Sequence, residues 1–397
     1  MSQETWILEG ARTALCRYVG QFADVSAIEL GAVASKGALD RSGIDPEHVD
    51  HVIIGNAQQT SPDAIYGARH VGLKAGVDEA TPALTVNRLC GSGIQSIVTA
   101  AQLLQLGEAD VVLAGGMENM SQAPHVIYGA RKGFSLGGGK MQDSLTLALL
   151  DPYCGFTMSQ TSDNLSNRFG IGREEQDEYA LGSQQRAAAA QERGVFVEEI
   201  VSVEVKTRKG AHFVDVDDHL RPGTMLEDLA KLKPAFGPDS CVTAGNASGV
   251  VDGAAAVVVA SAEWANEHGK KPLGKVISWG IVGVEPSCMG IGPVPASKLA
   301  LQKAGWALED VDLVEVNEAF AGQYLAVERD LGIDRERTNV NGGSIALGHP
   351  LGATGTRLIY TLLKELNRRG GGRGLATACI GGGQGIAMCV EVDANGI

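Results

Sequence analysis

The strongest constraint on the fold of this chain is an internal repeat with a spacing of 262 residues. When the sequence is shifted against itself by that distance, identical residues coincide from Lys36, which falls on Lys298, to Ala114, which falls on Ala376. The same register pairs Leu39 with Leu301, Gly43 with Gly305, Val52 with Val314, Gly93 with Gly355 and Ile97 with Ile359. A register held without gaps over such a distance predicts two copies of one structural unit.

Each copy is predicted to alternate strands with helices. In the first copy, the apolar run 52–54 and the glycine-closed run 111–114 predict strands, and apolar residues at helical spacing over 94–104 predict a helix between them. The second copy repeats this order at 313–316, 358–366 and 375–378. Strands that alternate with helices indicate the α/β class, with mixed sheets covered by helices and one sheet in each copy.

The two copies occupy the two ends of the chain and leave a long insertion within the first copy. This insertion is richer in polar and irregular sequence, and it is predicted to hold substrate because long insertions often carry binding function. The predicted boundaries are 1–120 plus 250–270 for an N-terminal half, 121–249 for an inserted loop domain and 271–397 for a C-terminal half.

Composition excludes several classes of protein. The net charge of −14 argues against nonspecific binding to nucleic acid. No apolar run is long enough to cross a bilayer, and the first residues lack the pattern of a secretory signal. The seven cysteines are scattered and include no CxxC pair, which argues against a disulfide framework and a structural zinc site. A cytoplasmic location, where thiols stay reduced, fits this pattern best.

Cys90 is a candidate nucleophile. It lies in the segment NRLCGSG at 87–93, directly before the predicted helix of the first copy. The positive end of a helix dipole favours thiolate over thiol, and the flanking glycines let a carbonyl group approach the backbone N–H groups. The alternative is a buried structural cysteine in a glycine-rich turn.

His349 is a candidate base for that cysteine. It belongs to the segment GHPLGATG at 348–355, which opens the matching helix of the second copy. At the repeat spacing it corresponds to Asn87, three residues before Cys90. If the copies pack about a pseudo-twofold axis, the two helix starts face each other and His349 can accept the proton of Cys90. A lone histidine is otherwise more often structural.

Two further motifs lie at predicted strand ends of the second copy. Cys379 begins the segment CIGGGQG at the end of the last predicted strand, where a second, exposed thiol can donate and accept protons. The glycines after it lack the Lys-Ser/Thr of a P-loop. Asn317 begins the segment NEAF, and its uncharged amide can anchor a water or donate to an oxyanion. Taken alone, that segment is a plain strand-end turn.

Together these motifs resemble the thiolase family, and the likeness runs from the first ten residues to the last ten. Cys90, Asn317, His349 and Cys379 match the four catalytic motifs of the family without substitution. The segment NASG at 246–249 matches the family's pantetheine contact. The resemblance implies a duplicated, layered α-β-α-β-α fold with an inserted loop domain. It also implies an acyltransferase of fatty acid metabolism and β-oxidation, working as a homodimer or homotetramer.

The resemblance also implies a two-step mechanism on acyl-CoA. Cys90, activated by His349, takes the acyl group as a thioester. Cys379 then removes a proton from a second acetyl-CoA for condensation, or protonates the departing acetyl-CoA in thiolysis. One oxyanion hole would consist of His349 and a water held by Asn317, and the other of the backbone N–H groups of Cys90 and Gly381. CoA is then a substrate, and neither a cofactor nor a metal ion is expected.

Further positions are assigned by the resemblance to binding. These are Arg221 and Thr224 near the nucleotide of CoA, Ser248 near the pantetheine, Met158 and Met289 at the acyl chain, and Phe320 in the substrate site. The first two lie in a stretch at 206–233 that is locally basic, through Arg208, Lys209, Arg221 and Lys231. On charge alone that stretch is equally a solvated loop. Thr157 departs from the histidine of many biosynthetic members, and 324–329 looks closer to short- and medium-chain 3-ketoacyl-CoA thiolases.

Two other functions remain open from the sequence. A decarboxylating ketoacyl synthase shares the duplicated architecture and a cysteine nucleophile, but it would be expected to use a histidine pair or a His/Asn pair where Cys379 stands. A catalytically silent subunit that binds acyl-CoA or lipid would have no use for two thiols and a base. The glycine-rich stretch at 130–142 is predicted to make a tetramer contact.

Overall fold

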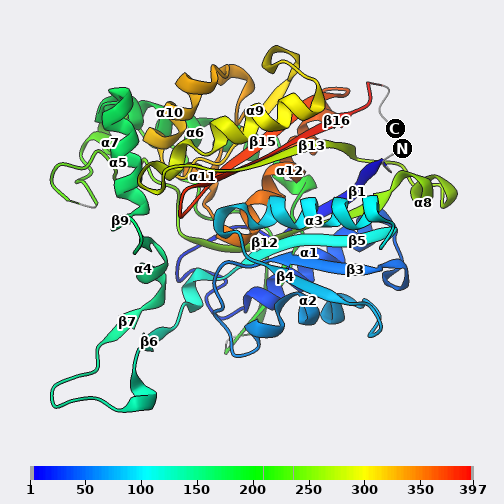
Figure 1. Cartoon of the computed structure of the whole chain (residues 1–397), viewed down its shortest axis with the longest axis horizontal. Helices are drawn as coiled ribbons and strands as arrows, with labels where there is room; N and C mark the ends of the chain where they lie inside the picture. The colour runs from blue at the N-terminus through cyan, green and yellow to red at the C-terminus, as the bar shows by residue number, and fades with distance from the viewer. Residues whose placement is uncertain (1–3, 209, 236, 395–397) are drawn as a thin grey trace.

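Helices and strands lie in five alternating layers in the structure, a computed structural model that describes residues 4–208, 210–235 and 237–394. Figure 1 shows helices on the two outer faces, strands beneath them and further helices in the centre. The predicted layered α/β architecture is therefore confirmed. No helix in these described ranges is long and apolar enough to span a membrane.

The strands of the two halves repeat one pattern. The first half has the order β1 (Thr5–Arg12), β12 (Val251–Ser261), β5 (Val111–Glu118), β3 (His51–Gly55) and β4 (Ala83–Val86), with the short β2 (Cys16–Arg17) paired to β12. The second half has the order β13 (Gly274–Gly283), β16 (Gln384–Val392), β15 (Gly372–Ile380) and β14 (Leu313–Val316). The parallel pairs β3–β5 and β14–β15 correspond, as do the antiparallel pairs β5–β12 and β15–β16. This correspondence confirms the duplication.

The two halves share one hydrogen-bonded sheet. Strands β1 and β13 pair antiparallel, with Thr5 opposite Val276 and Ile7 opposite Gly274. The expectation of one separate sheet in each copy is therefore wrong, because the outer strand of one half finds its backbone partners on the outer strand of the other. A second correction concerns Cys379, which was placed at the end of the last strand. It lies on β15, and β16 follows.

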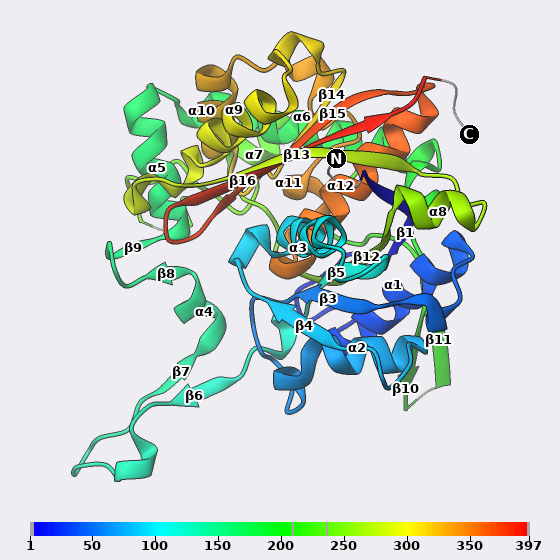
Figure 2. The ribbon, with the colours of Figure 1, turned by 45° about the vertical axis from the view of Figure 1, so that its right-hand side comes forward.

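The helices divide into outer and central sets. The outer faces are covered by α1 (Ala27–Ser42) and α2 (Gly67–Ala75) on one side and by α9 (Pro293–Ala304) and α10 (Ala321–Leu331) on the other. The central layer holds α3 (Ser92–Leu106) and α12 (Leu351–Arg368), and Figure 2 shows α3 almost end-on between the strands. Because it lies between two layers of strands, α12 is buried on nearly all sides.

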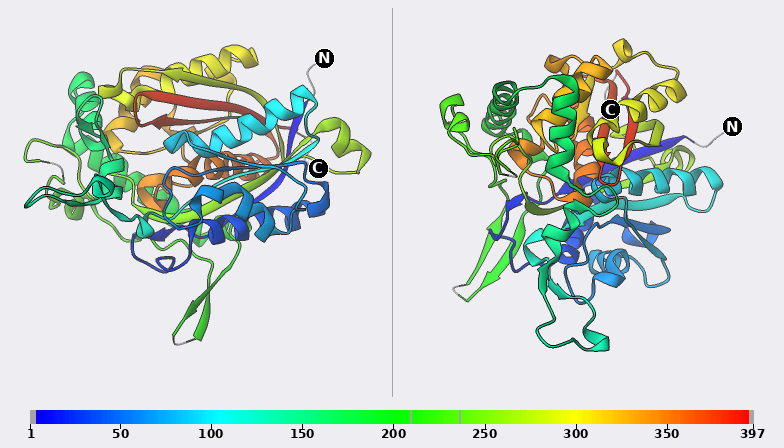
Figure 3. Two further views of the ribbon diagram at one scale, coloured as in Figure 1. Left: turned by 60° about the horizontal axis from the view of Figure 1, so that its bottom comes forward. Right: turned by 60° about the vertical axis from the view of Figure 1, so that its left-hand side comes forward.

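The segment between β5 and β12 is built from helices and short hairpins. Its helices are α4 (Ser144–Ala148), α5 (Met158–Phe169), α6 (Arg173–Glu192) and α7 (Leu226–Ala230). Its hairpins are β6 (His125–Ile127) with β7 (Met141–Asp143), β8 (Leu150–Asp151) with β9 (Phe156–Thr157), and β10 (Val203–Thr207) with β11 (Gly210–Val214). The hairpin β6–β7 extends away from the body in Figures 1 and 2, and β10–β11 does so in Figure 3. The remaining short helices are α8 (Ala262–Glu267) and α11 (Ser344–Leu347).

The first turns of α3 and α12 pack backbone against backbone. A Cβ atom on Gly93 would lie 2.4 Å from the backbone nitrogen of Thr356, and one on Gly355 would lie 2.3 Å from that of Ile94. Only glycine allows this approach. Because Gly93 and Gly355 also match at the repeat spacing, the two copies meet at equivalent points, close to the start of each helix.

Candidate active site

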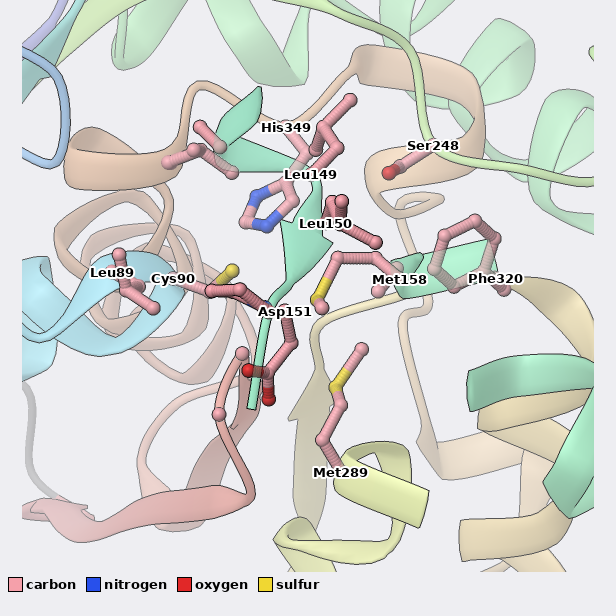
Figure 4. Close-up of a pocket in the computed structure, with 16 residues that line it drawn as sticks. Leu89, Cys90, Leu149, Leu150, Asp151, Met158, Ser248, Met289, Phe320 and His349 are labelled. Carbon is pink, nitrogen blue, oxygen red and sulfur yellow. The ribbon is translucent and has the colours of Figure 1, made fainter. Parts of the chain in front are cut away.

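One cavity of about 240 Å³ lies where the two halves meet the inserted segment (Figure 4). It is lined mainly by apolar side chains. Seven of the residues predicted from the sequence line it, namely Cys90, Met158, Ser248, Met289, Phe320, His349 and Gly381. The structure therefore brings together side chains that are up to 291 positions apart in the chain.

Cys90 lies in a 3₁₀ turn, Leu89–Gly91, that leads directly into α3. Leu89 adopts a φ of +46°, which is uncommon for a residue with a side chain and marks a tightly constrained turn. Burial raises the pKa of the Cys90 thiol to about 11, although a hydrogen bond from the backbone N–H of Gly381 acts in the opposite direction. Desolvation therefore acts against the ionisation of Cys90 that the helix dipole is expected to favour.

His349 faces Cys90 across the cavity (Figure 4). Its Nδ1 atom lies 2.6 Å from the hydroxyl oxygen of Thr354, and that hydroxyl donates its hydrogen to the carbonyl of Pro350 at 3.0 Å. The network therefore assigns the ring hydrogen to Nδ1 and leaves Nε2 free to accept a proton. Burial and the positive charge of Arg357 lower the pKa of His349 to about 3, so the ring is neutral at physiological pH.

Asn317 contacts His349 directly. It lies just after β14, and its Nδ2 atom is 3.3 Å from Nε2 of His349. Its Oδ1 atom accepts a hydrogen bond of 2.7 Å from the hydroxyl of Ser344. The Oδ1 and Nδ2 atoms of the amide thus each have a partner, and the amide N–H group points toward the imidazole.

Cys379 lies behind the cavity wall and close to Cys90. Its side chain is fully buried in a small apolar cluster with Met289 and Ala319, against which Met158 and Phe320 also pack. Burial, together with the nearby Cys90, raises its pKa far above the ordinary range of a thiol. The prediction of an exposed second thiol is therefore wrong.

Gly381 closes the site on the side of β15. A Cβ atom at this position would lie 3.2 Å from the sulfur of Met158 and 3.3 Å from a methyl group of Leu89. A side chain here would therefore intrude into the cavity, and its absence leaves the Gly381 N–H group open to the Cys90 sulfur.

Glu118 is a buried carboxylate near the nucleophile that the sequence did not reveal. It accepts backbone hydrogen bonds from Ala57 and Gln58, each at 3.0 Å, and from Gly352 at 2.8 Å. It therefore fastens the first turn of α12 to the end of β5, close to the point at which the two central helices meet. Burial raises the pKa of Glu118 to about 7.

A short part of the inserted segment forms one wall of the cavity. Its residues are Ala148, Leu149, Leu150, Asp151 and Pro152, of which three are labelled in Figure 4. No motif marks these residues, which run from the end of α4 through the short strand β8 into the turn of its hairpin. Thr354 was detectable, since it lies in the segment 348–355 that the repeat had singled out.

Two predicted CoA contacts lie elsewhere. Arg221 and Thr224 line a separate surface depression beside α6, together with Gln184 and Glu192. The Arg221 N–H donates to the Gln184 side chain at 3.0 Å, and the Thr224 hydroxyl donates to the Arg221 carbonyl at 2.8 Å. The structure does not bring these two residues into the reactive cavity. Lys209 of the basic stretch lies outside the described residues.

The sequence matches known proteins along nearly its whole length. The family model described as "Thiolase, N-terminal domain" matches residues 5–263, and "Thiolase, C-terminal domain" matches residues 270–392. The chain belongs to the thiolase family. As a thiolase it is an acyltransferase, and these matches support neither a ketoacyl synthase nor a silent subunit.

Individual relatives agree with this assignment. This thiolase is 52% identical over 387 residues to the human mitochondrial 3-ketoacyl-CoA thiolase, covering 97% of this chain and 98% of that protein. It is 48% identical over 387 residues to an acetyl-CoA acetyltransferase of Cupriavidus necator, with the same shares covered. The crystal structure of the human protein has a TM-score of 0.97 to this thiolase at 52% identity, covering 98% of this chain and 99% of that one. The crystal structure of the human protein in complex with CoA has a TM-score of 0.96 to this thiolase at 51% identity, and the match covers 99% of this chain and 98% of that one.

Proposed function

We propose that this thiolase catalyses the CoA-dependent cleavage of short- and medium-chain 3-ketoacyl-CoA, and the reverse condensation of two acetyl-CoA molecules to acetoacetyl-CoA. One observation carries the proposal: a cysteine and a neutral histidine whose Nε2 atom carries no hydrogen line one apolar cavity, and a second cysteine lies buried behind its wall, close to the first. The names of the relatives, which include both 3-ketoacyl-CoA thiolases and acetyl-CoA acetyltransferases, support both directions.

In the first half-reaction, Cys90 attacks the 3-keto carbonyl of a 3-ketoacyl-CoA in thiolysis, or the thioester carbonyl of acetyl-CoA in condensation, while Nε2 of His349 accepts its proton. The resting thiol is not ionised, because its pKa is about 11, so proton transfer has to accompany attack. The negative charge that develops on the carbonyl oxygen is stabilised by the backbone N–H groups of Cys90 and Gly381. The acyl group stays on Cys90, and the leaving group, which is acetyl-CoA in thiolysis and CoA in condensation, takes its proton from Cys379.

In the second half-reaction, the Cys379 thiolate takes a proton from CoA in thiolysis, or from the α-carbon of a second acetyl-CoA in condensation. The resulting thiolate or carbanion attacks the acyl group, and the released Cys90 thiolate takes its proton back from His349. The enolate oxygen of acetyl-CoA is stabilised by His349, whose Nε2 atom then carries the proton taken from Cys90, and by the amide group of Asn317, directly or through a water. The low solvent access of Cys379 protects the carbanion from bulk water. These groups suffice for both steps, and we propose that neither a cofactor nor a metal ion takes part.

The binding residues define which substrates fit. Met158, Met289 and Phe320 form an apolar, adaptable wall for a short acyl chain. We propose that Ser248 contacts the pantetheine arm, and that Arg221 and Thr224 contact the nucleotide of CoA. The proposed loop domain at 121–249 supplies several of these contacts, between an N-terminal half at 1–120 plus 250–270 and a C-terminal half at 271–397. β-Oxidation of fatty acids is the proposed pathway.

The hairpin β6–β7 supports an oligomer. It exposes the apolar side chains of Ile127, Tyr128, Phe134, Leu136 and Met141 at a site remote from the core. Exposed apolar residues gathered on a protruding element mark a contact surface, and we propose a homotetramer held by this hairpin. A Leu136→Asp variant is expected to lower the molar mass measured by light scattering, whereas Val197→Asp, at another exposed apolar residue, is not. An unchanged mass in both variants would refute the contact.

We also propose a cytoplasmic location. All seven cysteines, each within the described residues, are free thiols, which supports a reducing compartment. The human relative is a mitochondrial protein by its name, so fractionation of cells that express the tagged chain is the decisive test. Recovery of the chain in an organelle fraction would overturn the proposal.

The catalytic assignment is tested by thiolysis assays across 3-ketoacyl-CoA chain lengths, combined with mass spectrometry after incubation with acetyl-CoA. Wild-type protein is expected to gain one acetyl group on Cys90 and to cleave short and medium chains. Cys90→Ala is expected to lose both properties. Cys379→Ala is expected to keep the acetylation and lose thiolysis and condensation. The control is Cys241→Ala, which removes a half-buried thiol outside the cavity. Thiolysis by Cys90→Ala, or acetylation elsewhere, would refute the mechanism.

A further inference from the structure

A chain of buried polar side chains extends behind His349. Asn317 lies 3.3 Å from the imidazole, and the hydroxyl of Ser344 donates to Asn317 at 2.7 Å. A guanidinium nitrogen of Arg357 lies 3.3 Å from the Ser344 oxygen, and another lies 3.2 Å from the carboxylate of Glu315. The four side chains come from β14, its end, α11 and α12, and each is at most 3% exposed.

Only one arrangement of this chain gives every hydrogen in it an acceptor. A guanidinium group can only donate, so the Ser344 oxygen accepts from Arg357. The single hydroxyl hydrogen of Ser344 is then directed to Oδ1 of Asn317. The other end of the amide, Nδ2, can only donate, and it faces Nε2 of His349. Nε2 must therefore lack a hydrogen.

A second, independent set of contacts leads to the same tautomer. On the opposite side of the ring, the Thr354 hydroxyl donates to the Pro350 carbonyl and so can only accept from Nδ1 of His349. The ring hydrogen is thus held at Nδ1 from one side and excluded from Nε2 from the other. Figure 4 shows that it is this imidazole that stands next to the sulfur of Cys90.

We propose that Ser344 and Arg357 are positioning residues that fix the amide orientation of Asn317, and through it keep Nε2 of His349 as the proton acceptor for Cys90. The inference deepens the proposed function and rests on it. The two ends of an asparagine amide are nearly equal in shape, so packing alone does not distinguish the two orientations. A flipped amide would present Oδ1 to the ring and favour a hydrogen on Nε2, which could not then accept the proton of the thiol.

The placement of the Arg357–Glu315 ion pair also favours a positioning role. A buried ion pair contributes little net stability compared with apolar residues of similar volume. Here the pair is almost fully buried between β14 and α12, and a second guanidinium nitrogen of Arg357 donates to the hydroxyl that orients Asn317. An ion pair that only stabilised the fold would not need this contact with Ser344, which links it through Asn317 to His349.

The test compares Ser344→Ala with Ser96→Ala, which removes an equally buried hydroxyl from α3 that bonds only to its own helix at Gly93. Ser344→Ala is expected to lower the kcat of thiolysis on the order of 10- to 100-fold, with KM changed less than about twofold. Ser96→Ala is expected to retain wild-type kcat. Thermal unfolding of both variants establishes that they are folded. If Ser344→Ala does not fold, Ser344→Cys, which keeps the size but weakens the donor, is expected to show a smaller loss in kcat.

The pH dependence of Cys90 alkylation by iodoacetamide separates positioning from general damage. At pH 7 alkylation depends on removal of the thiol proton by His349, so the Ser344→Ala rate is expected to lie well below the wild-type rate. As the pH rises toward the Cys90 pKa of about 11, the thiolate forms without the base, and the two rates are expected to converge.

A ratio of rates that stays constant with pH, or a Ser344→Ala enzyme as active as Ser96→Ala, would overturn the proposal. Absence of thiolysis in the wild-type protein would instead refute the proposed function. The alkylation experiment does not depend on that activity, so the two failures are distinguishable.

Discussion

Replacing Gly355 by alanine tests whether the crossing of the two central helices sets the geometry of the site. The new Cβ atom would lie 2.3 Å from the backbone nitrogen of Ile94, about 1 Å short of the 3.4 Å at which ordinary contacts begin. The obstructing atom belongs to the backbone of α3 and cannot rotate away. The first turns of α3 and α12 therefore have to separate by about 1 Å.

This separation acts directly on the catalytic pair. Cys90 immediately precedes α3 and His349 immediately precedes α12, so each moves with its own helix. A displacement of about 1 Å between reacting groups costs on the order of 100-fold in rate. Overpacking of this kind costs about 1–3 kcal/mol in stability. Gly355→Ala is therefore expected to lose on the order of 100-fold in kcat for thiolysis while remaining folded at 25 °C.

The matched control is Gly182→Ala in α6. A Cβ atom there meets nothing within 4 Å, and the residue has helical backbone, so alanine is expected to stabilise the protein by about 0.5–1 kcal/mol without loss of rate. The assay is steady-state thiolysis of acetoacetyl-CoA, with denaturant unfolding in parallel. A Gly355→Ala enzyme within threefold of wild-type kcat would refute the idea that this crossing positions the pair.

Three further predictions follow from burial and charge. Because the pKa of His349 is lowered to about 3, the neutral base is present above that pH. The pH profile of kcat/KM is therefore expected to show no decrease in activity near pH 6.5 on the acid side. A decrease there that disappears in His349→Asn would contradict this. Arg12→Leu removes the ion-pair partner of the buried carboxylates of Glu199 and Asp217. It is expected to lower the free energy of unfolding, measured by denaturant titration, by about 3–5 kcal/mol. A decrease below about 1 kcal/mol would contradict this reasoning. Met289→Ala enlarges the apolar end of the cavity. In thiolysis assays it is expected to raise kcat/KM for longer 3-ketoacyl-CoA substrates relative to acetoacetyl-CoA. If the ratio of these two kcat/KM values is unchanged, the acyl chain of the substrate does not bind next to Met289.

The fold was predictable because its signals are local or periodic. The apolar strands and the helical spacing after Cys90 are patterns of neighbouring residues, and the repeat shows that the same patterns occur twice. The structure confirms the predicted strands at β3, β5, β14 and β15. The convergence of Cys90 and His349 was predictable for the same reason, since both precede matching helices. The exposure and the protonation state of these groups could not be predicted. Whether a thiol is exposed, as expected for Cys379, depends on side chains contributed by distant segments.

The loop wall and the buried polar chain were inaccessible to the sequence for another reason. Asp151 and its neighbours reach the cavity through an irregular segment, where no periodicity indicates which side chains point inward. Ser344 and Arg357 are separated by one helix start, and nothing in their spacing shows that Arg357 donates to Ser344 or that Ser344 donates to Asn317. Hydrogen-bond direction is a property of the assembled site and not of any one motif.

The duplication explains why the site needs both halves. At the repeat spacing, Cys90 corresponds to Gly352, and His349 corresponds to Asn87, so each copy carries one reactive group where the other carries none. The scaffold is symmetric at the glycine crossing, yet the chemistry on either side of it is not. An isolated copy would hold a nucleophile without its base, or a base without its nucleophile. The pairing of β1 with β13 and the packing of α3 on α12 are therefore requirements of the reaction as well as of the fold.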